Sequence, residues 1–347
     1  CSSDLLIKGN KSEIKELIDS GKNIVLTSHT NPDGDAIGSL IAMYNYLKKL
    51  NNTVTMMVPN KFPEFYKWLP KSEDIIIYEN RPKHAQKILH NADLIFALDF
   101  NALSRLGVLT DIVEATSCTR ILIDHHIDPE VDKFNYCYST TNVSSTAELV
   151  YSFIEMLGDE KLIDKNISEG IYTGIVTDTG SFSFSCNRPE TYNITSKLIS
   201  HGVDAQKIHK LIYDTFSENR LRLLGYAISE RMMVWDEYHT ALIYLSKEDL
   251  LKFNYQVGDT EGMVNYPLSM EKINMSVLIS EKDNLLRLSF RSKGDFSVND
   301  LCRKHFNGGG HKNAAGGREA NNIDAFIKKL KSILEDYKND LDYKISL

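Results

Sequence analysis

The chain has 347 residues, of which 42% are hydrophobic and 25% charged, and its net charge is −7. This composition is typical of a globular protein, and the length predicts two domains. The acidic charge argues against a protein that wraps long nucleic acid, which needs a basic surplus, but it leaves room for a small basic pocket that binds a short anion.

Cysteine spacing and hydrophobicity indicate the cellular compartment. The five cysteines include no CxxC pair and their number is odd, which argues against a zinc cluster or a disulfide framework. No stretch approaches about 18 consecutive apolar residues, and no signal peptide is visible. We therefore expect a cytoplasmic protein without a membrane span.

The first half of the chain alternates strand and helix signals. Apolar runs that predict buried strands lie at 23–29, 53–58, 75–77, 92–99 and 120–126. Helical spacing of apolar residues follows the first strand and recurs at 144–157, 167–178 and 190–222. Strands that are apolar throughout and separated by helices predict an α/β domain with a parallel sheet covered on both faces.

The second half of the chain has a different pattern. Strands are predicted at 239–246, 273–280 and 285–292, followed by a helix over FSVNDLCRKHF (296–306). A glycine-rich run, NGGGHKNAAGG (307–317), precedes a closing helix whose apolar face includes Phe326 and Tyr337. These elements predict a smaller α+β domain that a helical linker joins to the first.

Acidic and imidazole side chains stand where several of the apolar elements end. The stretch ILIDHH carries one strand into Asp124, His125 and His126. Ligands of an open parallel sheet bind beyond the carboxyl ends of its strands, so we expect such groups to meet at one rim. The set that we expect there is His29, Asp33, Asp35, Asp99, His125 and Asp178.

Six groups of this kind in one cleft predict bound cations. Without cations they would repel one another and resist burial. Histidine and aspartate ligands without thiolates suit Mn²⁺, Mg²⁺, Fe²⁺ or Zn²⁺. Six ligands exceed what one catalytic ion requires, whereas two ions that share one carboxylate fit the number. A pair of ions about 3.5–4 Å apart serves phosphoryl hydrolysis.

Each of these residues alone has a simpler interpretation. An aspartate after a buried strand is about as often a helix cap or a turn residue, and Asn31-Pro32-Asp33-Gly34 is a good turn sequence. A lone His29 is more often a structural histidine than a ligand. The metal site is favoured because these groups occur in the order HxxxDxD, D, DHH and D, and because each stands at the end of an apolar element.

This order of motifs, with GGGHKNAAG at 308–316, resembles the DHH phosphoesterase superfamily and its DHH-associated C-terminal domain. Length and layout resemble the NrnA-type subgroup, oligoribonucleases that also dephosphorylate 3′-phosphoadenosine 5′-phosphate (pAp). The resemblance spans nearly the whole chain. It implies a catalytic DHH domain over 1–195, a helical linker over 196–222 and a substrate-binding domain over 223–347, with the active site in the cleft between the domains.

The resemblance also implies two divalent metal ions, with Mn²⁺ preferred and Mg²⁺ or Co²⁺ as alternatives. One ion would be held by His29, Asp33 and Asp99. The second would be held by Asp35, Asp99, His125 and Asp178, so that Asp99 bridges the two. His126 would face the scissile phosphate as a proton donor or hydrogen-bond partner. Asp124 would not bind an ion itself but would orient a histidine by a hydrogen bond.

The glycine-rich run predicts an anion-binding loop in the second domain. Backbone N–H groups at Gly309 and Gly310 approach an anion closely, and His311 adds a side-chain donor. We expect Ala314 and Ala315 to begin a helix whose N-terminus faces the ligand. A simple loop or linker is the alternative for a glycine run taken alone.

Two arginines are candidate phosphate ligands. Arg291 ends a predicted strand, where its guanidinium suits a terminal phosphate, with a surface ion pair as the alternative. Arg105 follows Asp99 by six residues and would reach the scissile phosphate, with a salt bridge or a helix-dipole role as the alternative. Asn299 is a weaker candidate, because an N-cap of the helix at 300–306 explains it equally well.

Together these features predict a two-metal phosphoesterase that hydrolyses short RNA oligonucleotides to mononucleotides and pAp to AMP. The alternatives are a phosphodiesterase of pApA or cyclic dinucleotides, an exopolyphosphatase or pyrophosphatase, and a non-catalytic nucleotide sensor. A sensor is disfavoured because every expected ligand is present. The expected partners are short RNA and pAp, without long nucleic acid or membrane, and a homodimer is left open.

Overall fold

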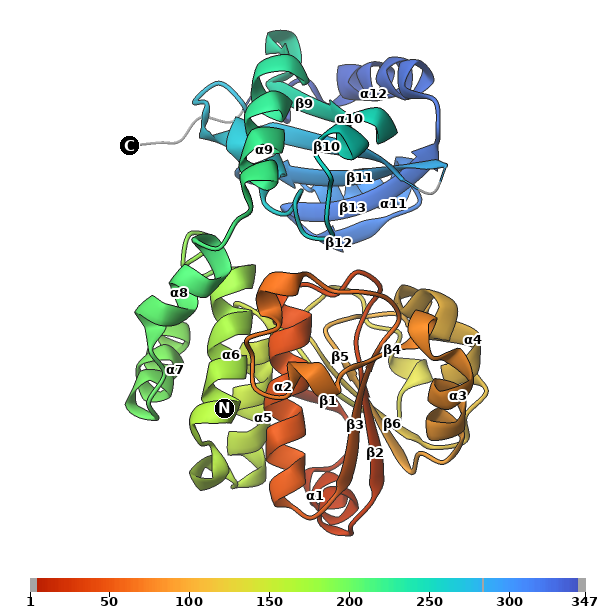
Figure 1. Cartoon of the computed structure of the whole chain (residues 1–347), viewed down its shortest axis with the longest axis vertical. Helices are drawn as coiled ribbons and strands as arrows, with labels where there is room; N and C mark the ends of the chain where they lie inside the picture. The colour runs from red at the N-terminus through yellow and green to blue at the C-terminus, as the bar shows by residue number, and fades with distance from the viewer. Residues whose placement is uncertain (1–4, 283, 343–347) are drawn as a thin grey trace. The chain divides into compact units, whose positions relative to one another are not determined.

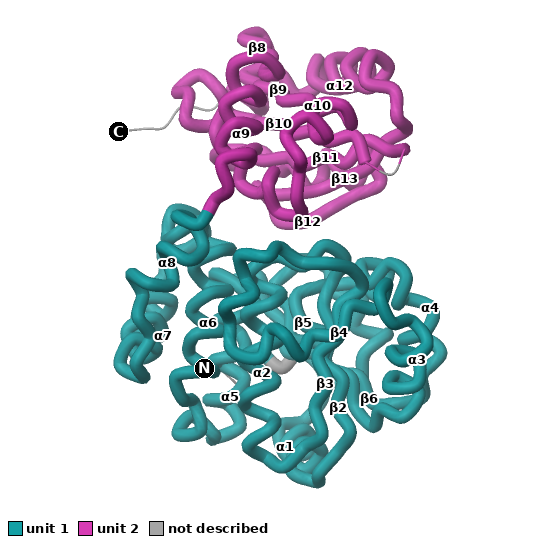
Figure 2. Tube along the Cα trace, viewed as in Figure 1, with its two compact units in different colours: residues 1–215 teal, residues 216–347 magenta. Residues whose placement is uncertain are grey.

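The computed structural model describes residues 5–282 and 284–342, which form two compact units (Figure 2). Unit 1 extends to Thr215 and unit 2 begins at Phe216. This boundary falls inside the segment 196–222. The division into a catalytic domain, a linker and a substrate-binding domain stays a prediction.

Unit 1 is built on a seven-stranded sheet with the order β1-β7-β6-β5-β2-β3-β4. Its strands are β1 (Leu6–Lys8), β2 (Asn23–Thr27), β3 (Thr53–Val58), β4 (Ile76–Ile77), β5 (Leu94–Leu98), β6 (Thr119–Asp124) and β7 (Tyr136–Ser139). All neighbouring pairs are parallel except β1 with β7. The predicted parallel sheet is therefore confirmed, although the sequence analysis missed the short strands β1 and β7.

Helices cover both faces of this sheet (Figure 1). They are α1 (Lys11–Asp19), α2 (Gly34–Lys49), α3 (Pro82–His90), α4 (Thr110–Glu114), α5 (Thr146–Leu157), α6 (Lys165–Asp178), α7 (Pro189–Ser200) and α8 (Ala205–Tyr213). Leu26 of β2 faces the core shared with α2, α5 and α6, whereas its neighbour Val25 faces the core shared with α3 and α4. Because both faces are buried, the strands are apolar throughout.

Glycines allow α2 and α6 to pack with their backbones in close contact. A Cβ atom at Gly38 would lie 2.4 Å from the carbonyl oxygen of Gly170, and a Cβ atom at Gly174 would lie 2.6 Å from Asp35 Oδ1. No side chain fits at either distance. The contact matters for function because α2 begins, and α6 ends, with residues of the predicted metal site.

Unit 2 contains a six-stranded sheet with the order β12-β13-β11-β10-β9-β8. Its strands are β8 (Met232–Trp235), β9 (Thr240–Leu245), β10 (Met275–Lys282), β11 (Leu285–Ser292), β12 (Gly309–His311) and β13 (Ala314–Ala320). Its helices are α9 (Glu218–Glu230), α10 (Lys247–Lys252), α11 (Val298–His305) and α12 (Ile323–Tyr337). Among the described strands of unit 2, only β9 and β10 pair in parallel. The predicted smaller α+β domain is confirmed.

Two further features bear on the sequence analysis. Across the described ranges, no helix combines the length and the apolar character needed to cross a membrane. The thiols of Cys118, Cys137, Cys186 and Cys302 are free, and Cys1 lies outside the described residues.

The close contact of α2 with α6 predicts the effect of a single methyl group. Gly38→Ala is expected to lower the free energy of unfolding by about 1–3 kcal/mol, because the added Cβ overlaps the Gly170 carbonyl. Urea denaturation measures this change. The control is Gly225→Ala in α9, where a Cβ atom meets nothing within 4 Å, and it is expected to stabilise by about 0.4–1 kcal/mol. If Gly38→Ala stabilises as much as the control, the helices are not in backbone contact.

Candidate active site

Three neighbouring parallel strands of unit 1 end at the same edge of the sheet. The strand β5 lies between β6 and β2. His29 follows β2, Asp99 directly follows β5, and Asp124 is the last residue of β6. All three side chains are buried. The fold therefore brings together polar groups from three segments at the edge where ligands of parallel sheets bind.

Asp33 and Asp35 stand where α2 begins. Asp33 is the N-cap, and its Oδ1 accepts hydrogen bonds from the N–H groups of Asp35 and Ala36, each at 3.1 Å. The same oxygen lies 4.0 Å from His29 Nε2. The sequence offered a helix cap and a metal ligand as alternative roles for Asp33. One carboxylate can thus serve in both. Asp35 is buried one residue further into the helix.

Among the described residues, Asp99 belongs to three clusters of possible metal ligands, two of which consist only of the predicted ligands. The first cluster is His29, Asp33 and Asp99, the second is Asp35, Asp99 and His125, and in each the ligand atoms lie within 4.8 Å of one another. His29 Nε2 is 3.5 Å from Asp99 Oδ2. His125 Nε2 is 3.5 Å from Asp99 Oδ1. Each oxygen of Asp99 therefore faces a different cluster.

Asp178 joins the second cluster through His125. The Nε2 atom of His125 lies 3.6 Å from Asp178 Oδ2 and 3.7 Å from Asp35 Oδ2. Asp178 is the last residue of α6, and the close packing of α6 on α2 carries it to this point. One imidazole nitrogen is thus surrounded by three carboxylates, from Asp35, Asp99 and Asp178.

The two clusters fit hard divalent cations. Ligands bound about 2.1 Å from an octahedral ion lie about 3 Å apart, so separations of 3.5–4.0 Å need only a small contraction around an ion. Oxygen and imidazole donors without thiolates suit Mn²⁺ or Mg²⁺. Two ions on either side of Asp99 would use all six of the predicted ligands.

The backbone of Asp99 is strained. Its φ is 67°, a left-handed conformation that residues with a side chain rarely adopt. The N–H of Asp99 still donates to the carbonyl of Ile123 at 3.1 Å. The chain therefore leaves the sheet only after this hydrogen bond between β5 and β6. Strain of this kind gathers at functional sites, and here it directs the shared carboxylate into both clusters.

Burial changes the protonation of the site. It raises the pKa of Asp35 and of Asp99 well above the usual range of an aspartate, and the neighbouring carboxylates raise both pKa values further. Burial also lowers the pKa of His29, which favours its neutral imidazole. The Nδ1–H of that ring donates to the carbonyl of Thr30 at 2.9 Å. Its Nε2 lone pair is then available to an ion.

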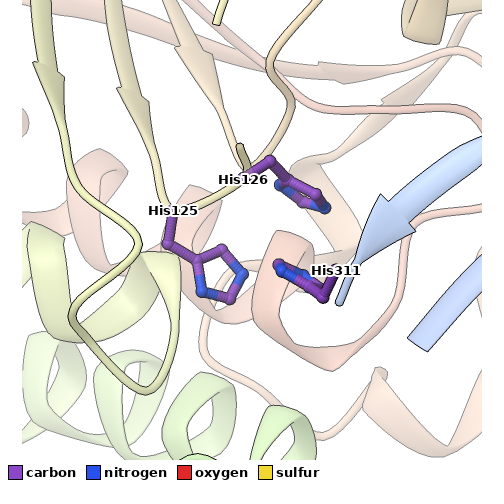
Figure 3. Close-up of side chains that lie close together, drawn as sticks. All are labelled: His125, His126 and His311. Carbon is purple, nitrogen blue, oxygen red and sulfur yellow. The ribbon is translucent and has the colours of Figure 1, made fainter. Parts of the chain in front are cut away.

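His125 and His126 are consecutive residues just beyond β6, but their rings have different surroundings (Figure 3). The ring planes make an angle of 78°. Nδ1–H of His126 donates to Asp124 Oδ1 at 2.7 Å, and the backbone N–H of His126 donates to Asp124 Oδ2 at 3.1 Å. Both oxygens of Asp124 therefore hold His126 in a fixed orientation.

Arg105 lies beside the first cluster. It belongs to the 3₁₀ segment Leu103–Leu109, and its positive charge contributes to the lowered pKa of His29. The carbonyl of Arg105 accepts the N–H of Thr30 at 2.8 Å, which ties this segment to the loop after β2. A half-buried guanidinium therefore lies near the rim that also carries the acidic groups.

The predicted substrate residues of unit 2 occupy one face of its sheet. Arg291 of β11 and His311 of β12 are both paired with Ala314 of β13, so their side chains leave the same face. In the adjacent row, Gly309 and Ser289 are paired with Gly316. Ala314 thus lies between Arg291 and His311 in one row, and both of these residues are half-buried.

One prediction about this region is wrong, and so is one of the alternatives that the sequence left open. Ala314 and Ala315 begin the strand β13 and not a helix, because the glycine-rich run folds into the hairpin β12–β13. Its glycines permit backbone contact: a Cβ atom at Gly308 would lie 1.9 Å from the Gly316 carbonyl oxygen. Ser297, and not Asn299, caps α11. Asn299 Oδ1 instead accepts the N–H of Gly310 at 2.8 Å and fixes the hairpin.

One residue of the site was missed by the sequence analysis. Thr146, at the start of α5, hydrogen-bonds to both Asp35 and Asp99. The signal was the Ser-x-x-Glu spacing of Ser145 and Glu148, which marks a helix N-terminus. The sequence analysis placed a helix there but did not connect its first turn with the carboxylates.

Comparison with known proteins gives two matches to family models and several relatives. Residues 23–175 match the model described as DHH family, N-terminal domain, and residues 239–336 match the DHHA1 domain. A Thermus thermophilus protein named bifunctional oligoribonuclease and PAP phosphatase NrnA is 30% identical over 296 residues, which cover 84% of this chain and 83% of that protein.

Two further relatives cover most of the chain. The Bacillus subtilis protein of the same name is 26% identical over 88% of this chain and 92% of its own length. A crystal structure of an exopolyphosphatase-related protein from Bacteroides fragilis superposes with a TM-score of 0.89 at 42% identity, covering 96% of this chain and 97% of that one.

The raised pKa values predict how the metal-free protein responds to pH. Folded Asp35 and Asp99 bind protons more tightly than in the unfolded chain, where an aspartate has a pKa of about 3.9. The stability from this protonation is complete below the unfolded pKa and is lost as pH rises through the folded pKa. The melting temperature of metal-free protein should therefore fall as the pH rises above about 4, the ordinary pKa of an aspartate, and Mn²⁺ should restore it at the higher pH.

The control for this titration is Asp35→Asn, which removes one ionising group and keeps the shape. Its melting temperature without metal should fall less steeply over the same pH range than that of the wild type. Identical slopes for the two proteins would show that Asp35 is not the buried acid that the structure describes.

Proposed function

Because this chain belongs to the DHH family of phosphoesterases, we propose that it uses two divalent cations, preferably Mn²⁺, to hydrolyse short RNA oligonucleotides and pAp. The predicted resemblance to the family is confirmed, and so is the prediction of a phosphoesterase. The substrates, the metal and the role of each residue are the proposal.

The observation that carries the proposal is the position of Asp99 between two clusters of metal ligands. Its two oxygens lie 3.5 Å from His29 Nε2 and from His125 Nε2, on opposite sides of one carboxylate. A single-ion site would need one cluster only. A structural role would not require three carboxylates around His125 in a buried site.

A pair of bound cations polarises the phosphate and lowers the pKa of the attacking water. His29, Asp33 and Asp99 would hold one ion, and Asp35, Asp99, His125 and Asp178 the other. The chain supplies the remaining groups. Asp124 accepts the Nδ1–H of His126 and so orients its ring. The Nε2 atom of His126 would then be a hydrogen-bond partner of the phosphate, or the proton donor to the leaving oxygen. Arg105 adds positive charge near His29, where it would pair with a phosphate oxygen.

Unit 2 would bind the rest of the substrate on the face that carries Arg291 and His311. The guanidinium of Arg291 and the imidazole of His311, on either side of Ala314, would contact a phosphate and its sugar. Gly309 and Gly310 lie in the same hairpin, where a side chain at Gly310 would strike the Ala314 carbonyl. The net charge of −7 disfavours long polyanions and is consistent with short substrates.

Inorganic polyphosphate or pyrophosphate is the second candidate substrate, since the Bacteroides fragilis protein that is 42% identical is described as exopolyphosphatase-related. Cyclic dinucleotides and pApA would require the same chemistry. A non-catalytic nucleotide sensor is the alternative from a different class.

A substrate panel with one variant tests the proposal. Purified protein with Mn²⁺ should turn over pAp and RNA of two to five nucleotides faster than cyclic dinucleotides or polyphosphate. Asp99→Asn should lower turnover by about 1000-fold or more, because both ions lose a ligand that is worth several kcal/mol to the transition state. The exposed Asp132→Asn is the control and should act like the wild type. Polyphosphate as the fastest substrate would overturn the assignment, and unchanged turnover by Asp99→Asn would favour the sensor.

Arg291→Ala separates substrate binding from chemistry. It should weaken binding of phosphate-ended substrates by about 10–100-fold, the value of a charge-assisted hydrogen bond. Hydrolysis of an artificial aryl phosphodiester should change little, because that substrate has no second phosphate. The matched control is Arg222→Ala, an exposed arginine of the same unit that pairs with Glu218. Equal losses on both substrates would contradict a phosphate role for Arg291.

A further inference from the structure

The first turn of α5 contacts the two carboxylates of the second cluster directly. Thr146 is buried, and its N–H donates to Asp35 Oδ2 at 2.6 Å. The N–H of Ala147 donates to Asp35 Oδ1 at 2.8 Å. The hydroxyl of Thr146 donates to Asp99 Oδ1 at 2.9 Å. One residue therefore holds both Asp35 and Asp99.

This turn is itself held in place by an ion pair between Glu148 and the half-buried Arg188. Glu148 is buried, and its Oε1 accepts from Arg188 Nη1 at 2.8 Å. Its Oε2 accepts from the hydroxyls of Ser144 and Thr191 at 2.6 and 2.8 Å, and from the N–H of Ser144 at 3.0 Å. Ser145 caps the helix by accepting the N–H of Glu148. The donors of Thr146 thus have a fixed position.

We propose that Thr146 is a positioning residue that sets the rotation of the Asp99 carboxylate between the two ions. This inference rests on the proposed two-cation function. With Oδ1 held by Thr146, Oδ1 faces His125 and Oδ2 faces His29, each at 3.5 Å. Without that hydroxyl, the carboxylate is free to turn, and Oδ1 loses its fixed direction toward the second ion.

The two donors of Thr146 have separable effects. The backbone N–H groups of Thr146 and Ala147 hold Asp35 whatever the side chain is. The hydroxyl alone holds Asp99. Thr146→Val keeps the shape and the backbone donors and removes only the hydroxyl. The ion held by Asp35, Asp99 and His125 should therefore be affected more than the ion held by His29, Asp33 and Asp99, because Oδ1 faces the former.

The test is calorimetric titration of Mn²⁺ into the full-length, metal-free protein. The wild type should bind two ions. Thr146→Val should bind one of them about 10–100-fold more weakly, the usual effect of losing a residue that orients a ligand, with a smaller change at the other. Thr146→Ser keeps the hydroxyl and should restore binding. Thr195→Val is the matched control, because its buried hydroxyl donates to the Thr191 carbonyl and touches no ligand.

The outcomes are distinguishable. If the wild type binds two ions and folded Thr146→Val binds both equally well, the inference fails and the proposed function stands. Failure of Thr146→Ser to restore binding also overturns it, because a merely structural role would then explain the loss. If the wild type binds no ion, the proposed function and this inference fail together. Should Thr146→Val not fold, Thr146→Ala removes the same hydroxyl with less bulk, and the same Mn²⁺ titration of that variant tests the inference.

Discussion

The arrangement of the site depends on one buried carboxylate that faces two groups of ligands. Asp99 directly follows the central strand β5, which lies between β2 and β6. Its burial beside Asp35 and Asp124 is unfavourable for a charged aspartate, as its raised pKa shows. Bound cations would offset that cost, so folding and metal binding are linked through this residue.

Several distant features serve to bring ligands to Asp99. The glycines between α2 and α6 let the start of one helix and the end of the other approach within reach of His125. The left-handed backbone of Asp99 directs its side chain away from the strand. The first turn of α5 contributes three hydrogen bonds to two carboxylates. All three features bring or hold ligands at one common centre.

The sequence predicted the elements that carry a strong local pattern. Buried parallel strands are apolar on both faces, so β2, β3, β5 and β6 were visible as runs, and the polar groups beyond them marked the edge of the sheet. The sequence did not show the edge strand β1 or its neighbour β7, because both are short. It also did not show the hairpin of Gly309 to Ala320, because glycines carry no side-chain pattern. The contacts of Thr146 were hidden for another reason: they cross more than 40 residues and depend on tertiary packing.

The most direct measurement is the anomalous diffraction of a crystal grown with Mn²⁺. Two peaks about 3.5–4 Å apart, one on each side of Asp99, are expected for a shared carboxylate between two ions. A single peak, or two peaks without Asp99 between them, would contradict the central claim that this carboxylate bridges a pair of cations.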